Sequence, residues 1–196
     1  MLYLSEMKRL LTILILIFTF QIPSQADDIR DFQIEGMSIG DSLLDFISED
    51  KIVKKYFPKS KKFYTVELTN VELDVYDDIE LAVKDNDKTY KIHGVRGYIF
   101  FENDTNNCLK KKDEIVEELS EFFKNNARKI DKGAIDYISD IKSDTSKIVT
   151  VQFIFNSGDA VHVTCYDMQD STLGATGVEV STTTREYWKW NNTEAY

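Results

Sequence analysis

The stretch IVTVQFIFNSGDAVHVTCYD, residues 148–167, contains two runs of largely alternating apolar and polar side chains, separated by the polar tetrapeptide NSGD. Successive side chains of a β-strand point to opposite faces of a sheet, so this period of two is typical of strands with one buried and one wet face. Asn, Ser, Gly and Asp favour a tight turn. The stretch therefore predicts a β-hairpin. The residues expected on the buried face are Val149, Val151, Phe153, Phe155, Val161, Val163 and Cys165.

Similar alternation occurs on both sides of this hairpin. Residues 64–68 and 79–83 alternate, the polar turn DNDK follows at 85–88, and residues 89–101 form the return arm of a second hairpin. The run GVEVSTTT at 177–184 predicts a last strand. Antiparallel strands connected by tight turns, rather than regular alternation of strand and helix, indicate an α+β fold.

Two segments have helical periodicity. In 109–130 an apolar stripe opposes exposed glutamates, which predicts an amphipathic helix. In 39–47 apolar residues follow Ser38 and Asp41, whose side-chain oxygens could cap a shorter helix. The polar segment 131–147 is interpreted as a linker or loop. The stripe of the longer helix consists of Ile115, Val116, Leu119, Phe122 and Phe123.

Together these elements predict one α+β domain over residues 27–196. We expect an antiparallel sheet of about five to six strands, covered on one face by the two main helices. A helix followed by a strand meander occurs twice, which suggests pseudo-repeat halves at about 35–105 and 106–196.

The N-terminus has the pattern of a secretory signal peptide. Lys8 and Arg9 precede the apolar run 10–20, and Ser24 and Ala26 provide the small residues that signal peptidase requires. We expect cleavage after Ala26 and a periplasmic location, with translation starting at Met1 or Met7. The apolar run is shorter than the roughly 20 residues that span a bilayer, so no permanent membrane span is expected after cleavage.

The charge of the chain limits its partners. It contains 24 basic and 34 acidic residues, a net charge of −10. Loss of Lys8, Arg9 and Glu6 with the signal peptide leaves 22 and 33, a net charge of −11. Such a chain is repelled by nucleic acid and by anionic lipid. Cationic proteins, peptides or metal ions are better partners, and another periplasmic or envelope protein is the expectation.

The chain contains two cysteines, Cys108 and Cys165. An even number of cysteines in an exported protein is usually paired, so we predict a disulfide. The alternative is a zinc site that combines both cysteines with His162 and perhaps His93. His162 and Cys165 are three residues apart on a strand and face opposite ways, which disfavours one shared ion.

Two resemblances accompany these patterns. The strings FQIEGMSIGDSLLDFIS, GYIFFENDTNNCLKKKDEIVEELS and VQFIFNSGDAVHVTCYD, with the closing AY, resemble a family of small exported proteins from marine alphaproteobacteria that has no assigned activity. More loosely, the Gly36-Met37-Ser38 entry is similar to outer-membrane assembly lipoproteins of the SmpA/OmlA type and to beta-lactamase inhibitory protein repeats. Those modules bind proteins, which implies a binding role, although the lipidated cysteine and the Gly-x-Pro after the helix are absent here.

Catalytic motifs are incomplete. The block Gly40-Asp41-Ser42-Leu43 resembles the serine motif of GDSL esterases, which implies Ser42 as nucleophile, with His93 or His162 as base. That family has an aspartate three residues before the histidine; Asp159 stands there before His162, whereas Tyr90 stands there before His93. No local pattern brings Ser42 to either histidine, so capping of a helix by Asp41 and Ser42 is favoured, and both histidines are interpreted as exposed strand residues.

The remaining sequence predicts no catalytic residue, metal ligand or cofactor site. Asp85 and Asp87 lack the glycine and glutamate of a calcium loop and are interpreted as turn residues. The C-terminal segment REYWKWNNTEAY concentrates Tyr187, Trp188 and Trp190, which either pack a terminal helix onto the sheet or bind a partner. We therefore predict a non-enzymatic binding or protein-interaction module. The alternatives are a serine hydrolase and a small-ligand or metal-ion binding protein.

Overall fold

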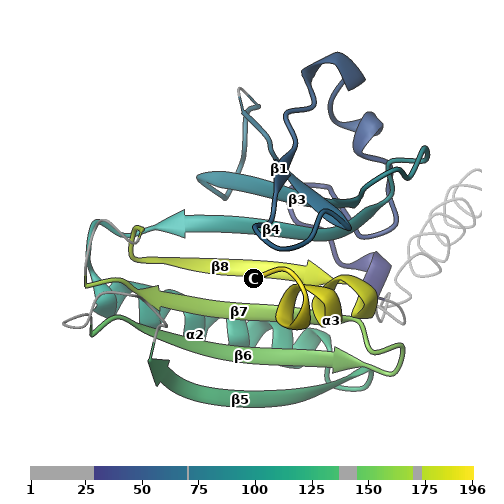
Figure 1. Cartoon of the computed structure of the whole chain (residues 1–196). Helices are drawn as coiled ribbons and strands as arrows, with labels where there is room; N and C mark the ends of the chain where they lie inside the picture. The colour runs from purple at the N-terminus through teal and green to yellow at the C-terminus, as the bar shows by residue number, and fades with distance from the viewer. Residues whose placement is uncertain (1–28, 70, 137–144, 170–173) are drawn as a thin grey trace, which may run out of the picture.

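A computed structural model describes residues 29–69, 71–136, 145–169 and 174–196, which form an α+β fold (Figure 1). The predicted signal peptide lies outside the described residues. The helices are α2 (Thr105–Phe122) and α3 (Arg185–Thr193), with the 3-10 turns η1 (Ile29–Asp31), η2 (Leu43–Asp45) and η3 (Glu49–Lys51). The strands are β1 (Lys55–Tyr56), β2 (Phe63–Glu67), β3 (Asp78–Lys84), β4 (Ile92–Phe100), β5 (Ala127–Asp136), β6 (Lys147–Phe155), β7 (Ala160–Asp167) and β8 (Gly177–Thr183).

The strands form one antiparallel sheet in the order β1-β2-β3-β4-β8-β7-β6-β5. Two groups of four strands, each consecutive in sequence, meet where β4 pairs with β8. The sheet has eight strands, so the prediction of five to six was too low. One reason is β5, which combines the end of the predicted helix, residues 127–130, with the start of the segment interpreted as a loop, residues 131–136. Nearly all side chains of β5 are exposed, so buried and exposed positions do not alternate along it. The segment is a strand because its backbone pairs with β6.

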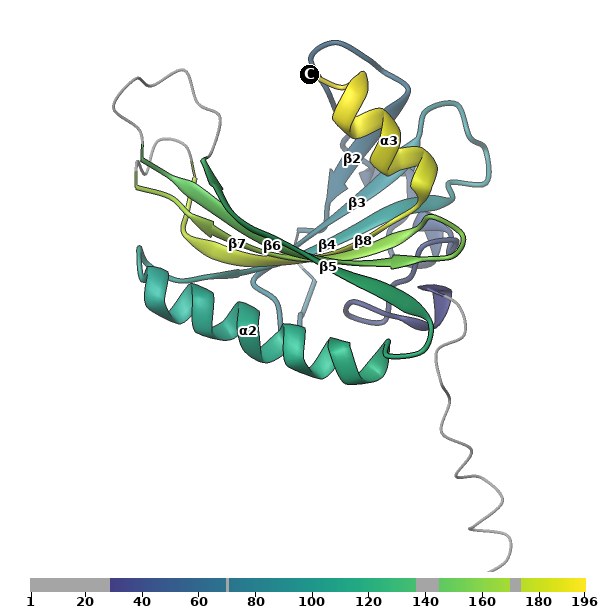
Figure 2. The ribbon, with the colours of Figure 1, turned by 90° about the horizontal axis from the view of Figure 1, so that it is seen from below.

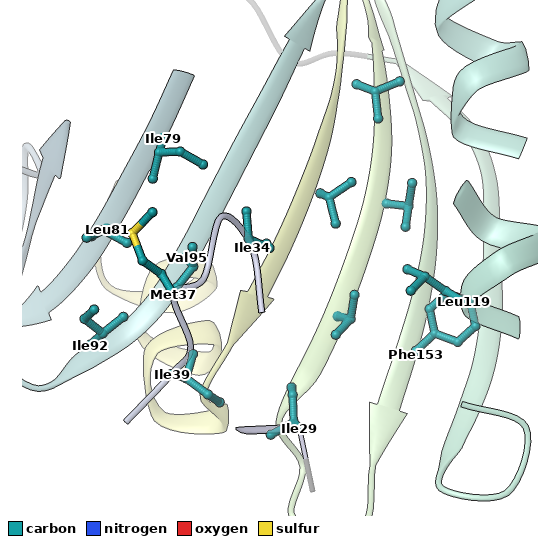
Figure 3. Close-up of a cluster of buried hydrophobic side chains, with 14 of the residues drawn as sticks. Ile29, Ile34, Met37, Ile39, Ile79, Leu81, Ile92, Val95, Leu119 and Phe153 are labelled. Atoms are coloured by element: carbon teal, nitrogen blue, oxygen red, sulfur yellow. The ribbon is translucent and has the colours of Figure 1, made fainter. Parts of the chain in front are cut away.

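The predicted hairpin at 148–167 is confirmed as β6 and β7, and the return arm at 89–101 as β4. Helix α2 begins four residues before the predicted start, with Asp104 as its cap, and ends at Phe122 because β5 follows. Its buried side chains include Val116 and Leu119, whereas Phe122 is exposed. These buried side chains pack against the apolar faces of β6, β7 and β8 (Figure 3).

The predicted helix at 39–47 is wrong. Gly36 and Gly40 have positive φ angles of 75° and 101°, outside the right-handed helical region. The amide of Gly40 donates to the Ile92 carbonyl, and that of Leu43 to the Tyr90 carbonyl. These backbone amides pair with the start of β4 and with the residue two positions before it, so they are not available for the hydrogen bonds of a helix. The chain from 34 to 43 is irregular instead, and its apolar side chains Ile34, Met37 and Ile39 lie against the sheet on the side of α2 (Figure 3). Leu43 belongs to the same buried cluster.

Helices α2 and α3 lie on opposite faces of the sheet (Figure 2). The two helices expected to cover one face were those at 39–47 and 109–130, and only the second forms, as α2. The disulfide fixes α2 against β7, because Sγ of Cys108 lies 2.00 Å from Sγ of Cys165. Helix α3 is instead held by Trp190 and Tyr187, which pack on Phe63 of β2 from the other side. Within the described ranges, neither helix is long and apolar enough to cross a bilayer.

Candidate functional site

The face of the sheet opposite α2, here called the polar face, carries two rows of polar side chains that run across the strands. Each row follows from the strand register, because side chains at paired positions point to the same side. The first row is Gln152, His162, Ser181, Arg96, Glu80 and Glu67. The second is Thr150, Thr164, Glu179, Tyr98 and Asp78. Charged side chains thus lie in the middle of this face of the sheet. Burying them under a second apolar layer would be costly, so this face differs from a hydrophobic core.

Helix α3 forms one wall of the polar face. Thr184 caps it by accepting a hydrogen bond from the Tyr187 amide at 3.2 Å. Trp190 is only 1% exposed, and its Nε1 donates to Ser60 Oγ at 2.9 Å. Trp188, two residues away, is 36% exposed. Of the three aromatic residues singled out in the sequence, Tyr187 and Trp190 therefore attach the helix, and Trp188 is available to a partner.

Two hollows open on the polar face. The acidic hollow, of about 370 Å³, lies over β2, β3, β4 and β8 and is lined by Glu67, Asp78, Glu80 and Glu179 together with Tyr98 and Phe100. The neutral hollow, of about 560 Å³, lies between α3 and β5 to β8. Arg96, Tyr166 and Glu179 line both hollows. The polar face is therefore one continuous surface with an acidic and a neutral part.

The acidic hollow has more carboxylates than bases. Arg96 pairs with Glu80 at 2.9 Å, and Lys55 pairs with Glu67. Among the described residues Asp78 and Glu179 form no ion pair within 4.0 Å, and Glu179 accepts a hydrogen bond from the Tyr166 hydroxyl at 3.1 Å. Burial and the nearby Glu67 raise the pKa of Asp78. An incoming cation would relieve this repulsion.

His162 lies between the sheet and α3 in the neutral hollow. It is 5% exposed, so the expectation of an exposed strand histidine was wrong. Its ring lies 4.4 Å from that of Trp188, and Nε2 is 3.3 Å from Thr183 Oγ1. Burial lowers the pKa of His162 to about 4, with Glu179 opposing and Arg96 adding to the effect. His162 is therefore neutral at physiological pH.

This lowered pKa gives a testable pH dependence of stability. The unfolded chain binds a proton at His162 below pH 6.5, whereas the folded chain does so only near pH 4. The free energy of unfolding should therefore fall as the pH is lowered through this window, with a contribution from His162 on the order of 3 kcal/mol. Urea unfolding at several pH values, compared with His162→Gln, measures that contribution. Equal pH slopes for the two proteins would contradict it.

Ser42 and His93, the other residues considered for catalysis, have different hydrogen-bond partners. Ser42 donates to the Thr89 carbonyl at 3.0 Å and accepts from the Leu44 amide, which makes it the cap of η2. His93 Nδ1 lies 3.2 Å from Thr184 Oγ1. These contacts give Ser42 no histidine partner and favour the capping interpretation.

In the described part of the chain, no group of three or more His, Cys, Asp or Glu side chains is placed to hold a metal ion. Both cysteines are used in the disulfide. Asp85 binds Lys54 and Tyr56, and Asp87 accepts from the Thr89 amide and hydroxyl, as turn residues do.

Comparison with known proteins gives no match to any family model, curated protein or solved structure. The two resemblances drawn from the sequence therefore stay predictions. The function has to be inferred from the polar face itself.

Sequence reasoning missed the centre of this face. Arg96, Tyr98 and Glu179 lie on strands that were predicted, but none of the three residues was singled out. One signal could have indicated this centre. In the strand sequences GVRGYIFF and GVEVSTTT, a single charged residue, Arg96 or Glu179, stands among uncharged neighbours. The cross-strand rows themselves depend on the β4–β8 pairing, which no local pattern specifies.

Proposed function

We propose that the protein is an exported, non-enzymatic binding module that docks a basic surface segment of another envelope protein on its polar face. The observation that carries this proposal is the position of exposed large hydrophobic side chains. Phe100 is 46% exposed at the acidic hollow, and Ile135, Trp188 and Tyr196 are 49%, 36% and 66% exposed around the neutral hollow. Exposed aromatic anchors beside a polar surface are typical of protein interfaces.

The size of the polar face favours a protein partner. Neighbouring strands are about 4.8 Å apart, so the two rows extend over roughly 19–24 Å of sheet. This width exceeds that of a single small-molecule pocket and approaches that of a protein interface of standard size.

The charge of the polar face favours a basic partner. The chain has a net charge of −10, and Asp78 and Glu179 are carboxylates of the acidic hollow without a cation of their own among the described residues. A Lys or Arg side chain that enters the acidic hollow would form an ion pair with a carboxylate and a cation–π contact with the rings of Tyr98 and Phe100.

The role of the acidic hollow can be tested with isosteric variants. Asp78→Asn combined with Glu179→Gln removes two negative charges but keeps both shapes, and the new amide carbonyl at position 179 can still accept from Tyr166. We expect binding of the envelope partner to weaken by about tenfold or more, because the lost charges face the basic segment directly. The measurement is recovery of the partner, identified by mass spectrometry, on immobilised protein over a salt series.

A matched control removes the same charge from the opposite face. Glu117→Gln combined with Glu118→Gln changes two exposed glutamates of α2. This variant should recover the partner as the unmodified protein does. Equal losses in both double variants would show that only net charge matters and would overturn the docking site, as would unchanged binding in Asp78→Asn/Glu179→Gln.

A further inference from the structure

The neutral hollow has a lining that differs from that of the acidic hollow. Among the described residues that line it, the charged members are Arg96, Lys132 and Glu179, of which Arg96 is paired with Glu80 and hydrogen-bonds Tyr187. The other polar members carry hydroxyl or amide groups or the neutral imidazole of His162. The aliphatic hydroxyl and amide side chains are Thr150, Gln152, Thr164, Ser181, Thr183, Asn191 and Asn192. A site of this composition selects hydrogen-bonding capacity rather than charge.

An aromatic ring is held in a fixed position at this hollow. The Trp188 and His162 rings are 4.4 Å apart with an interplanar angle of 30°, so His162 supports the indole from the sheet side. Trp188 keeps 36% of its surface exposed, although Tyr187 and Trp190 of the same helix are buried. A supported and partly exposed indole offers an apolar platform of defined orientation.

One buried polar atom at the hollow has no partner. Among the described residues, the Asn191 Oδ1 is buried and accepts no hydrogen bond. A buried acceptor without a donor is rare in folded proteins and points to a group that completes it. Asn191 follows Trp188 by three residues on α3, so the two side chains are neighbours on the helix surface. The missing donor is therefore expected next to the indole platform.

We infer that the neutral hollow binds a neutral saccharide, with a CH face of a sugar ring against Trp188 and a hydroxyl donating to Asn191 Oδ1. A sugar ring combines one apolar face with several hydroxyls that both donate and accept, which matches the lining group by group. The volume of about 560 Å³ lies within the roughly 300–1,000 Å³ of small-molecule sites. The inference goes beyond the docking of a basic protein, with which it shares Trp188, and it otherwise uses the neutral part of the polar face.

An extended peptide fits the neutral hollow less well. Peptides commonly bind a sheet by adding a strand to its edge, where backbone N–H and C=O groups are free. The hollow lies on the face of β6, β7 and β8, whose backbone groups are used in pairing with their neighbours. A peptide there would leave its own backbone groups to be satisfied by side chains alone.

The test is a titration of the folded protein with glucose, N-acetylglucosamine, maltose, cellobiose and chitobiose, followed by the indole NMR signals. We expect at least one sugar to shift the Trp188 signal saturably. Asn191→Ala and Trp188→Ala should each weaken binding of that sugar by about tenfold, as measured by titration calorimetry, because Trp188→Ala lacks the reporting indole. Phe122→Ala removes an exposed aromatic from the opposite face and should leave binding unchanged. Thermal unfolding of each variant verifies that it is folded.

Three results would overturn the inference. One is the absence of any saturable shift for all five sugars. Another is sugar binding that Asn191→Ala and Trp188→Ala leave intact. The third is a Trp188 signal that responds to a Lys- and Arg-containing peptide but to no sugar. Asp78→Asn separates this inference from the proposed protein docking, because Asp78 lines only the acidic hollow and its loss should leave sugar binding unchanged.

Discussion

Replacement of both Cys108 and Cys165 by alanine should lower the free energy of unfolding by roughly 4 kcal/mol. The two cysteines are 57 positions apart, and a disulfide that closes a loop of this length restricts the unfolded chain by about that amount. The bridge also joins α2 to β7 in a site where both cysteines are 0% exposed, so the alanines add a small loss of packing. Urea unfolding followed by tryptophan emission measures the difference.

A control for this prediction uses the unmodified protein. Its unfolding curve in the presence of a phosphine reductant should move toward that of the double alanine variant once the bridge is reduced. A loss below about 1 kcal/mol in the variant would contradict the prediction, since the loop-closure contribution alone exceeds that value.

Trp190→Ala should cost about 3–5 kcal/mol, the range found for large aromatic residues removed from a core. The Trp190 ring lies 4.9 Å from that of Phe63 and 4.9 Å from that of Phe57, and its Nε1 hydrogen bond to Ser60 would be lost as well. These contacts hold α3 on the sheet. The variant should therefore lose the wall of the neutral hollow together with stability, which chemical denaturation and indole NMR signals would both show.

Trp188→Ala is the matched control for this change, because it removes the same ring from the same helix two positions away. Trp188 is 36% exposed, so its removal should cost about 1 kcal/mol or less. Similar losses for the two variants would contradict the division of α3 into an attachment side and a side that faces a ligand.

The predictions from sequence succeeded where the local pattern determines the structure. The NSGD turn at 156–159 and the alternation on both sides of it were sufficient for β6 and β7, and the apolar face of Cys165 placed it correctly for the disulfide. Of the stripe predicted for the helix, Val116, Leu119 and Phe123 are buried, whereas Phe122 is exposed.

The failures concern structure that depends on distant partners. In β5 the residues 131–136 are all exposed, and only pairing with β6 makes them a strand. The segment at 39–47 has helical spacing, but its amides bond to Tyr90 and Ile92 on another part of the chain. The side of the sheet on which α3 packs depends on Phe63, 127 residues before Trp190. No window of local sequence contains these contacts.

The polar face was the least accessible part from sequence for the same reason. Its rows combine strands from both ends of the chain, so Asp78, Tyr98 and Glu179 become neighbours only when β4 and β8 pair. Trp188 was singled out in advance because of the unusual aromatic content of the C-terminal segment, and His162 was considered only as a zinc ligand or a catalytic base. Binding surfaces that extend across a sheet are properties of the register rather than of a motif.

The central claim is that the polar face, and not the face covered by α2, meets the partner. Photo-crosslinking from single positions in the native envelope tests it most directly, with a benzophenone side chain at Phe100 on the polar face and, separately, at Glu117 on α2. We expect a discrete protein adduct from position 100, joined at a Lys- or Arg-rich segment, and none from position 117. Adducts from position 117 alone, or from neither position, would contradict the claim.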